Sequence, residues 1–181
     1  MSFLGTKEIE TERLILRPFK LGDEVAMFKN YCNDERVCEF STWKPHKKIE
    51  VTKEYLQVCC LEKYNLGLTY KWAIVLKETN EVIGAIDVIN YKIEKHQASL
   101  GYVLGYNFWG KGFMPEAGKA VINHLFNEGF VRVDAWHHIK NEKSGRVMQK
   151  MGMTYEGTLK KFDMDKDGKL QDMKLYAIVK N

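Results

Sequence analysis

The sequence predicts an α+β fold in which helices flank a mixed, largely antiparallel β-sheet. Two patterns predict this class. Short alternating or β-branched segments recur along the chain, and segments with apolar residues three or four positions apart separate them. Their order is a strand, two helices, a run of strands, two strand–helix units and a final strand pair. No repeat or linker interrupts this order, so residues 1–181 are predicted to form a single domain.

The first predicted strand covers residues 13–17, which alternate in polarity and stop at Pro18. A helix is predicted to begin at Gly22, because two acidic residues follow in what would be its first turn. A second helix is predicted over residues 48–63, and the aromatic loop 39–46 before it is a candidate pocket wall or a plain connection. The buried side of the first helix is expected to carry Val25, Phe28 and Cys32.

The middle of the chain contains two predicted strands, residues 72–76 and 82–89, which a short turn joins into a hairpin. A third strand, residues 98–104, leads into a glycine-rich loop. The next helix is predicted over residues 115–127, because proline suits the first helical position and Gly129 can end the helix. One face of this helix is apolar: Ala117, Val121 and Leu125.

The last part begins with a strand that alternates over residues 131–135. A short helix over residues 141–152 is predicted next, with Asn141 as its N-cap. Two strands, residues 154–164 and 169–179, then surround an Asp-Gly turn and close the fold.

The glycine loop is the most informative local feature. Gly110 and Gly112 lie where a predicted strand gives way to a helix, so successive backbone N–H groups can point into one concavity beside the positive end of the helix dipole. Such a concavity binds anions. The spacing matches neither a dinucleotide fingerprint nor a nucleotide P-loop, so a pyrophosphate site and an ordinary strand-to-helix turn both remain open.

Composition excludes several classes of protein. The 28 basic and 24 acidic residues give a net charge of +4 without a run of five like charges, which argues against a nucleic-acid partner or a membrane-surface partner. The N-terminus lacks a signal-peptide pattern and no apolar run approaches a membrane span, so a cytoplasmic protein is expected. The four cysteines lack C-x-x-C spacing, and we expect reduced thiols and no metal site.

Four stretches, in order, make the chain similar to a known family. They are TERLILR at 11–17; LGY at 100–102, leading into WGKGF at 109–113 and Glu116-Ala117; Asn141 and Ser144, leading into KMGM at 150–153 and Glu156-Gly157; and Asp167-Gly168 with Asp172 and Tyr176. On these residues the chain resembles the GNAT superfamily of N-acetyltransferases, most closely its RimJ/RimL ribosomal-protein branch. The resemblance covers residues 12–176 and implies the GNAT, or acyl-CoA N-acyltransferase, fold with acetyl-CoA as co-substrate.

The resemblance also implies a binding site for the coenzyme. The pyrophosphate would bind the backbone N–H groups of the glycine loop, and the pantetheine arm would lie where the strand at 101–105 splays from the next parallel strand at 132–136. A free strand N–H at Leu104 would then meet the thioester oxygen, a donor commonly worth a factor of about 10² to 10³ in rate. The implied coenzyme contacts are Val103, Leu104, Gly105, Gly110, Lys111, Gly112, Phe113, Met114, Asn141 and Ser144.

Two of these residues have alternative interpretations. Asn141 would cap its helix and reach the pantetheine, or only cap the helix. Ser144 would protonate the leaving thiolate, or only form a hydrogen bond with the sulfur, or simply be an exposed helix serine.

The chain departs from the family at two positions. Asn107 replaces the Arg or Gln that many members carry before the loop, and little consequence is expected. Ser99 stands where many relatives carry a glutamate that serves as general base in part of the superfamily. A serine cannot take that role, so Asp87, His137, His138 and a water chain all remain candidates.

A site without a strong base favours an acceptor amine of low pKa. An α-amine near about 7.7–8.0 is partly neutral at pH 7, whereas a lysine amine near about 10.4 is not. A protein or peptide N-terminus is therefore the predicted acceptor. A small-molecule amine, such as a polyamine, antibiotic or amino acid, stays open, and so does a non-catalytic acyl-CoA-binding sensor. Homodimers are common in the family, and Phe40 and Trp43, with Tyr55, Tyr64 and Tyr70, would form the acceptor wall.

Overall fold

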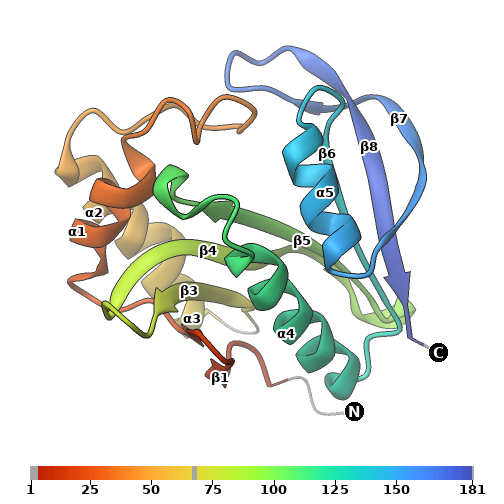
Figure 1. Cartoon of the computed structure of the whole chain (residues 1–181), viewed down its shortest axis with the longest axis horizontal. Helices are drawn as coiled ribbons and strands as arrows, with labels where there is room; N and C mark the ends of the chain where they lie inside the picture. Colours follow the sequence, from red (N-terminus) through yellow and green to blue (C-terminus); the bar gives the residue numbers. More distant parts are fainter. Residues whose placement is uncertain (1–3, 67–68, 181) are drawn as a thin grey trace.

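The computed structural model describes residues 4–66 and 69–180. Within these residues eight strands form one sheet in the order β1-β2-β3-β4-β5-β6-β8-β7 (Figure 1). Neighbouring strands are antiparallel except β5 and β6, which are parallel. The predicted α+β class is therefore confirmed. The strands are β1 Ile9–Glu10, β2 Leu14–Arg17, β3 Lys71–Leu76, β4 Glu81–Lys92, β5 Gln97–Leu104, β6 Arg132–His138, β7 Thr154–Met164 and β8 Leu170–Val179.

Helices cover both faces of the sheet. Helices α4 (Phe113–Glu128) and α5 (Glu142–Lys150) pack on one face, and α1 (Asp23–Met27), α2 (Ile49–Leu56) and α3 (Glu62–Asn65) lie on the other (Figure 1). Each face has its own cluster of buried apolar side chains. We call the two sides the α4 face and the α1 face. No helix among the described residues is long and apolar enough to cross a membrane.

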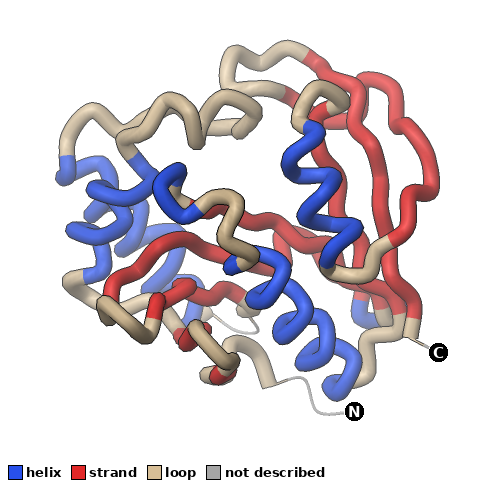
Figure 2. Tube along the Cα trace, in the orientation of Figure 1, coloured by secondary structure: helices blue, strands red, loops and turns tan. Residues whose placement is uncertain are grey.

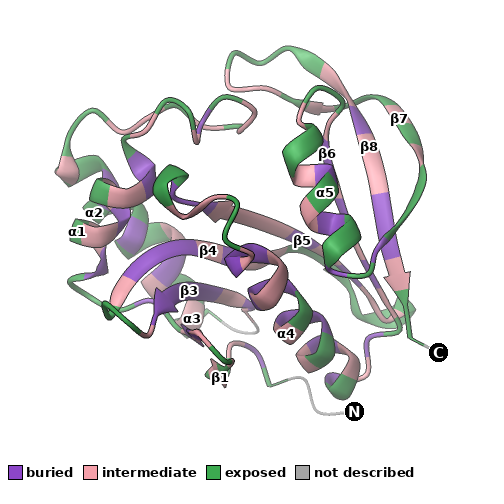
Figure 3. Ribbon diagram, in the orientation of Figure 1, coloured by how far each residue is buried: buried purple, intermediate pink, exposed green. Residues whose placement is uncertain are grey.

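Strand β3 lies between the two cores. Trp72 and Ile74 belong to the cluster on the α4 face, whereas Ala73 and Val75 belong to the cluster on the α1 face. A strand buried on both sides needs a continuous apolar run, which this segment supplies. Figure 3 shows the contrast with β7 at the sheet edge, where most residues are exposed or only partly buried.

Helix α4 begins two residues earlier than predicted. Gly112, at φ 81°, turns the chain into the helix, so the helix starts at Phe113 and Pro115 lies in its first turn. Proline is tolerated there because the first-turn N–H groups have no helical partner. The predicted apolar face is confirmed, since Ala117, Val121 and Leu125 are fully buried. The short edge strand β1 was not predicted.

Two π-helical segments were also not predicted. Segment η1 (Phe28–Cys32) continues α1, and segment η2 (Gln57–Leu61) joins α2 to α3. A π turn adds a residue to the helical repeat and shifts which side chains face inward. Val25 is 58% exposed, while Tyr31 and Cys32 are buried, so the predicted inward position of Val25 is wrong.

Strands β5 and β6 pair only where they begin. Their register runs from Gln97↔Arg132 to Ser99↔Asp134, and the strands then separate, as Figure 1 shows. Residues 100–104 of β5 and 135–138 of β6 continue without pairing to each other. We call these two segments the splayed region. This divergence was expected from the family resemblance and is present.

Candidate active site

Strand β5 presents backbone groups to the splayed region. The Gly105 N–H donates to the Ile83 oxygen of β4 at 2.8 Å, and backbone groups alternate in direction along a strand. The Leu104 N–H therefore points to the opposite edge, where β6 has separated. By the same alternation, the backbone groups of Val103 face β4. The Trp109 indole N–H donates to the Leu104 oxygen at 2.7 Å and holds the strand end against the glycine loop.

The glycine loop presents unpaired N–H groups at the start of α4. Gly110 and Gly112 have φ angles of 77° and 81°, a left-handed conformation that favours glycine. The five backbone N–H groups from Gly110 to Met114 have no hydrogen-bond partner among the described residues. A Cβ added to Gly110 would meet no heavy atom within 4 Å, so the space above the loop is open. The predicted anion-binding concavity has this geometry.

The start of β2 anchors this loop. The Glu116 carboxylate accepts the Thr11 hydroxyl at 2.7 Å, the Arg13 N–H at 2.9 Å and the Arg13 Nε–H at 2.7 Å. Arg13 also donates to the Lys111 oxygen at 2.9 Å and lies over the Phe113 ring at 4.5 Å. Burial raises the pKa of Glu116, but hydrogen bonds from Thr11 and Arg13 outweigh it, so the net shift is downward. One carboxylate thus fixes the loop relative to the sheet.

Helix α5 begins beside the splayed region. The Asn141 side chain accepts the Ser144 N–H at 3.3 Å, which confirms Asn141 as the N-cap. The Ser144 hydroxyl lies 2.7 Å from the Tyr102 hydroxyl of β5. Burial raises the pKa of Tyr102, and the hydrogen bond to Ser144 offsets only part of that rise. Tyr102 is therefore protonated at neutral pH and can act as a hydrogen-bond donor.

Asp87 lies on the α1 face of the sheet. Its Oδ2 is 3.0 Å from the Lys71 ammonium, which also donates to the Tyr55 hydroxyl at 3.2 Å. Burial alone would lower the pKa of Lys71, but Asp87 and Tyr55 reverse the shift and raise it. Asp87 Oδ1 faces Gly101 of β5, because a Cβ added there would lie 3.2 Å away. The other carboxylate oxygen thus points toward the splayed strand.

The two histidines at the end of β6 have different environments. The His137 Nδ1–H donates to the His138 backbone oxygen at 2.8 Å, and its Nε2 is buried against Gly145 without a partner among the described residues. Burial lowers the pKa of His137, so the ring is neutral at pH 7. His138 accepts the Lys140 N–H at Nδ1 and is hydrogen-bonded through Nε2 to Gln171. Both nitrogens of His138 are therefore engaged.

The aromatic loop reaches the C-terminal hairpin. Figure 2 shows the long connection between η1 and α2 running along the top of the molecule toward the β7–β8 turn. The Phe40 ring stacks on His138 with centroids 5.3 Å apart, and Lys44 lies 3.0 Å from Asp167 of the turn. Trp43 packs instead on His46, at 5.7 Å. Tyr70, which was predicted to belong to the acceptor wall, is instead buried in the apolar cluster of the α4 face.

The structure thus gathers the glycine loop, Leu104 and Ser144 around the splayed region, with Asp87 on the α1 face of the neighbouring strand β4. Sequence reasoning missed the contacts of Tyr102 with Ser144 and of Lys71 with Asp87. It also missed the anchoring role of Glu116. Tyr102 and Glu116 stand inside the motif stretches, which was the available signal.

The residues present fit a coenzyme A group. The N–H groups of a glycine loop at a helix N-terminus suit a pyrophosphate, and the Lys143 ammonium lies 4.9 Å from the neighbouring Trp109 ring. The unpaired edge of β5 suits an amide-bearing arm. No group of three His, Cys, Asp or Glu side chains that could hold a metal ion occurs in residues 4–66 and 69–180.

Comparison with known proteins identifies the family of this chain. Residues 13–154 match the family model described as "Acetyltransferase (GNAT) domain". An "Uncharacterized N-acetyltransferase YoaA" of Bacillus subtilis is 32% identical over 174 residues, covering 95% of this chain and 96% of the relative. A solved ribosomal-protein-alanine acetyltransferase from Vibrio fischeri is 26% identical, with a TM-score of 0.74 and 96% of each chain covered.

RimL, a ribosomal α-N-protein acetyltransferase solved in complex with coenzyme A, shares the fold at a TM-score of 0.82 and 21% identity. The match covers 96% of this chain and 98% of RimL. The chain belongs to the GNAT family of acetyltransferases. It is an N-acetyltransferase.

Proposed function

We propose that this N-acetyltransferase transfers the acetyl group of acetyl-CoA to the free α-amine of a protein or peptide N-terminus. The observation that carries the proposal is that a serine stands at the position where the family's general base is expected. Ser99 stands where many relatives have a glutamate, and the candidate carboxylate, Asp87, is paired with the buried Lys71 ammonium. Such a site favours an amine that is already partly neutral, and an α-amine with a pKa of about 7.7–8.0 meets that condition. The ribosomal-protein-alanine acetyltransferase relative supports the same class of acceptor.

In this proposal the glycine loop and α4 hold the coenzyme. The N–H groups of Gly110, Lys111, Gly112, Phe113 and Met114 would donate to the pyrophosphate, next to the positive end of the helix dipole. The loop is held in its binding conformation before the ligand arrives, because Arg13 and Glu116 fix it to β2. Fixing a loop in advance lowers the entropic cost of binding.

Bound acetyl-CoA supplies an acetyl thioester. The Leu104 N–H would donate to the thioester oxygen as negative charge develops there, which is the usual role of an oxyanion donor. The amine nitrogen forms a bond to the carbonyl carbon, and the carbon–sulfur bond breaks. The Ser144 hydroxyl would give its proton to the leaving sulfur and take one back from solvent, while the neutral Tyr102 hydroxyl, 2.7 Å away, would hold the serine side chain in place.

The attacking amine must also lose a proton. Asp87 Oδ1 faces the backbone of Gly101 on the splayed strand, beside the side chain of Ile89. Asp87 would therefore receive that proton directly or through a water, while its Oδ2 stays bonded to Lys71. His138 is less suited to the role because both its nitrogens are engaged, and the free Nε2 of His137 is buried against α5.

Mass spectrometry tests the proposal most directly. Acetyl-CoA is offered with two pools of acceptors, one of peptides with free N-termini and one of polyamines, amino acids and aminoglycosides. Acetylation of peptide α-amines is the expected result. Transfer confined to the small molecules would contradict the choice of acceptor, and silence in both pools would favour a sensor that binds acyl-CoA without catalysis.

A further inference from the structure

A row of three residues crosses the sheet toward the splayed region on the α1 face. Lys71 of β3 pairs with Asp87 of β4, and Asp87 pairs in turn with Gly101 of β5. Residues that pair directly across a sheet present their side chains on the same face. Gly101 has no side chain, so Asp87 carries the last side chain of the row before the separating strand, with Ile89 beside it.

Lys71 is held firmly behind Asp87. Its ammonium lies 3.0 Å from Asp87 Oδ2 and donates to the Tyr55 hydroxyl at 3.2 Å, and its side chain is 13% exposed. The backbone is fixed as well, because the Lys71 N–H donates to the Thr6 hydroxyl at 2.8 Å and the Lys71 oxygen accepts the Tyr64 hydroxyl at 2.6 Å. The ammonium therefore stays on one side of the carboxylate, and Oδ1 faces β5.

The other titratable side chains around this pair are uncharged or already paired. They lie on the helices of the α1 face: Tyr31, Tyr55, Cys60, Tyr64 and Asp23. Burial raises the pKa of the three phenols and of the thiol, to about 12 for Cys60 and Tyr64. All four are therefore neutral between about pH 6 and pH 9. Asp23 is bound to Arg17 at 2.8 Å, so Lys71 and Asp87 set the charge of this cluster.

A lone carboxylate at this position would oppose the reaction. An opposite charge favours the charged form of a titratable group, so an unbalanced Asp87 would hold an incoming α-amine as the ammonium. An ammonium has no lone pair with which to attack a thioester. The Lys71 ammonium, 3.0 Å from the same carboxylate, cancels most of this attraction, because the field of two close opposite charges falls off faster than that of one charge.

We propose that Lys71 is a positioning residue that balances the charge of Asp87, so that the acceptor amine is bound in its neutral form. The proposal rests on the proposed function, since it takes Asp87 as the group that receives the proton. The acceptor leaves its first proton in solvent, its nitrogen bonds to the acyl carbon, and its second proton goes to Asp87. Lys71 keeps its own protons throughout.

The test follows kcat and KM for one N-terminal peptide substrate from about pH 6 to about pH 9. In Lys71→Met the unbalanced carboxylate should raise the pKa of the bound amine by about one unit, the lower end of the effect of a nearby charge. On the acidic limb of the profile this lowers kcat about tenfold. The KM for the peptide should fall there, because the ammonium is held more tightly. Near the alkaline end kcat should return to the wild-type value.

Three variants serve as controls. Lys71→Arg keeps the charge and should keep the wild-type profile. Lys29→Met removes an exposed ammonium that is paired with Glu81 at 2.7 Å, and it should change neither kcat nor KM. Lys71→Gln removes the charge but keeps an N–H donor for Asp87, so it gives the same measurement should Lys71→Met fail to fold.

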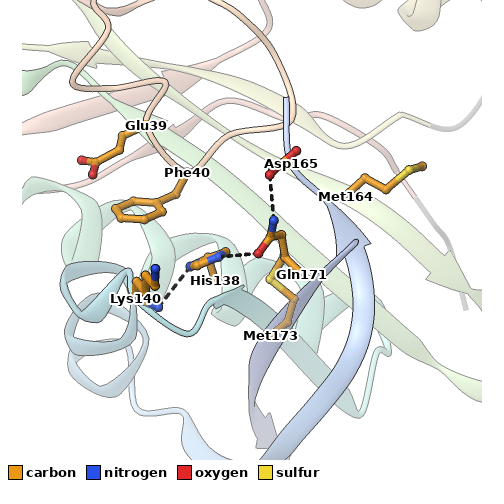
Figure 4. Close-up of a pocket in the computed structure, with 8 residues that line it drawn as sticks. All are labelled: Glu39, Phe40, His138, Lys140, Met164, Asp165, Gln171 and Met173. Carbon is orange, nitrogen blue, oxygen red and sulfur yellow. Dashed lines mark hydrogen bonds between the residues drawn. The ribbon is translucent and has the colours of Figure 1, made fainter. Parts of the chain in front are cut away.

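The histidines at the end of β6 are the competing source of a pH effect. Burial lowers the pKa of His137, so this ring is neutral at pH 7. Figure 4 shows His138 hydrogen-bonded to the Gln171 side chain and to the Lys140 N–H. His138→Asn removes a titrating ring, and the shift caused by Lys71→Met should persist in this background. A shift that disappears with His138 would overturn the inference.

Two further outcomes would contradict the role of Lys71. A loss of kcat by the same factor at both ends of the pH range, without a fall in KM, would mean that Lys71 only supports the fold. In an Asp87→Asn background, adding Lys71→Met should change kcat little at low pH, and a tenfold loss there would mean that Lys71 acts independently of Asp87. Either result leaves the proposed function intact. No acetylation of any peptide by the wild-type protein would overturn both.

Discussion

Replacing Glu116 by Gln should weaken both the fold and acetyl-CoA binding. The carboxylate accepts hydrogen bonds from the Thr11 hydroxyl and the Arg13 N–H through Oε1, and from the Arg13 guanidinium through Oε2. A glutamine keeps the first two, but its amide group would face the Arg13 donors. The variant therefore loses the charge-assisted contacts to one guanidinium.

The size of the effect follows from exposure. A hydrogen bond to a charged group is worth about 1.5–3 kcal/mol when buried, and an exposed ion pair is worth under about 1 kcal/mol. Arg13 is 41% and Glu116 18% exposed, so a loss of about 1.5 kcal/mol is expected. In a domain of this size that lowers Tm by about 3–6 °C. Without Glu116 to hold it, Arg13 also forms a weaker hydrogen bond with the Lys111 oxygen of the glycine loop. If this costs about 1 kcal/mol of binding free energy, the Kd for acetyl-CoA rises about fivefold.

Thermal melts and calorimetric titration with coenzyme A measure the two effects on one sample. Glu81→Gln is the control, because it breaks the exposed Lys29 pair and should change Tm by about 1 °C or less. A lower Tm with an unchanged Kd in Glu116→Gln would refute the argument that this anchor shapes the coenzyme loop.

Acidity gives a second check on the same variant. The folded-state pKa of Glu116 lies below the usual 4.5. Its stabilising contribution is therefore complete above that usual pKa and is lost as pH falls through the folded value. The Tm difference between wild type and Glu116→Gln should close in this acidic range. A difference that persists there would mean that charge is not its cause.

Three further variants test the proposed site. Gly110→Glu should abolish acetyl-CoA binding, because it places bulk and negative charge where the N–H groups converge. An unchanged affinity in a titration would contradict the assignment of this loop to the pyrophosphate. Ser144→Ala should lower kcat about a hundredfold with the KM for acetyl-CoA nearly unchanged, and an unaltered kcat would remove the hydroxyl from the chemistry. Asp87→Asn should flatten the acidic limb of the pH–rate profile, and a profile identical to that of the wild type would mean that water is the base. Tm is measured as well, because the substitution removes the ion-pair partner of the buried Lys71.

The sequence predicted the fold and the glycine loop because both depend on local patterns. Alternation and helical spacing located most strands and helices, and Gly110 and Gly112 indicated the concavity from their position before a helix. The π-helical segment that contains Tyr31 was not predicted, because an analysis of hydrophobic periodicity assumes a constant repeat of about 3.6 residues per turn. Within this helix Val25 is exposed, while Tyr31 and Cys32 of the π-helical segment are buried.

The side-chain pairs of the site could not be predicted in the same way. Tyr102 and Ser144 are 42 residues apart, and Arg13 and Glu116 are 103 apart, so each contact depends on the register of the whole sheet. The position of the C-terminal hairpin depends in addition on an irregular β7, whose register shifts between Leu159 and Asp163 and whose Lys161 has a φ of 49°. No local pattern encodes where such a hairpin returns over the sheet.

The short β5–β6 pairing has a consequence for the lifetime of the protein in a cell. Three residue pairs join the part of the sheet formed by β1–β5 to the part formed by β6–β8, so a ligand lying along the splayed region completes a seam in the sheet. A ligand present at a hundred times its Kd stabilises the folded state by about 2.7 kcal/mol. We therefore expect resistance to proteolysis to rise with acetyl-CoA concentration, which a digestion series measures directly. A proteolysis rate that does not change with acetyl-CoA concentration would mean that the two parts of the sheet are held together equally well without the ligand. If resistance rises as expected, the abundance of this enzyme in a cell would follow the supply of its own co-substrate.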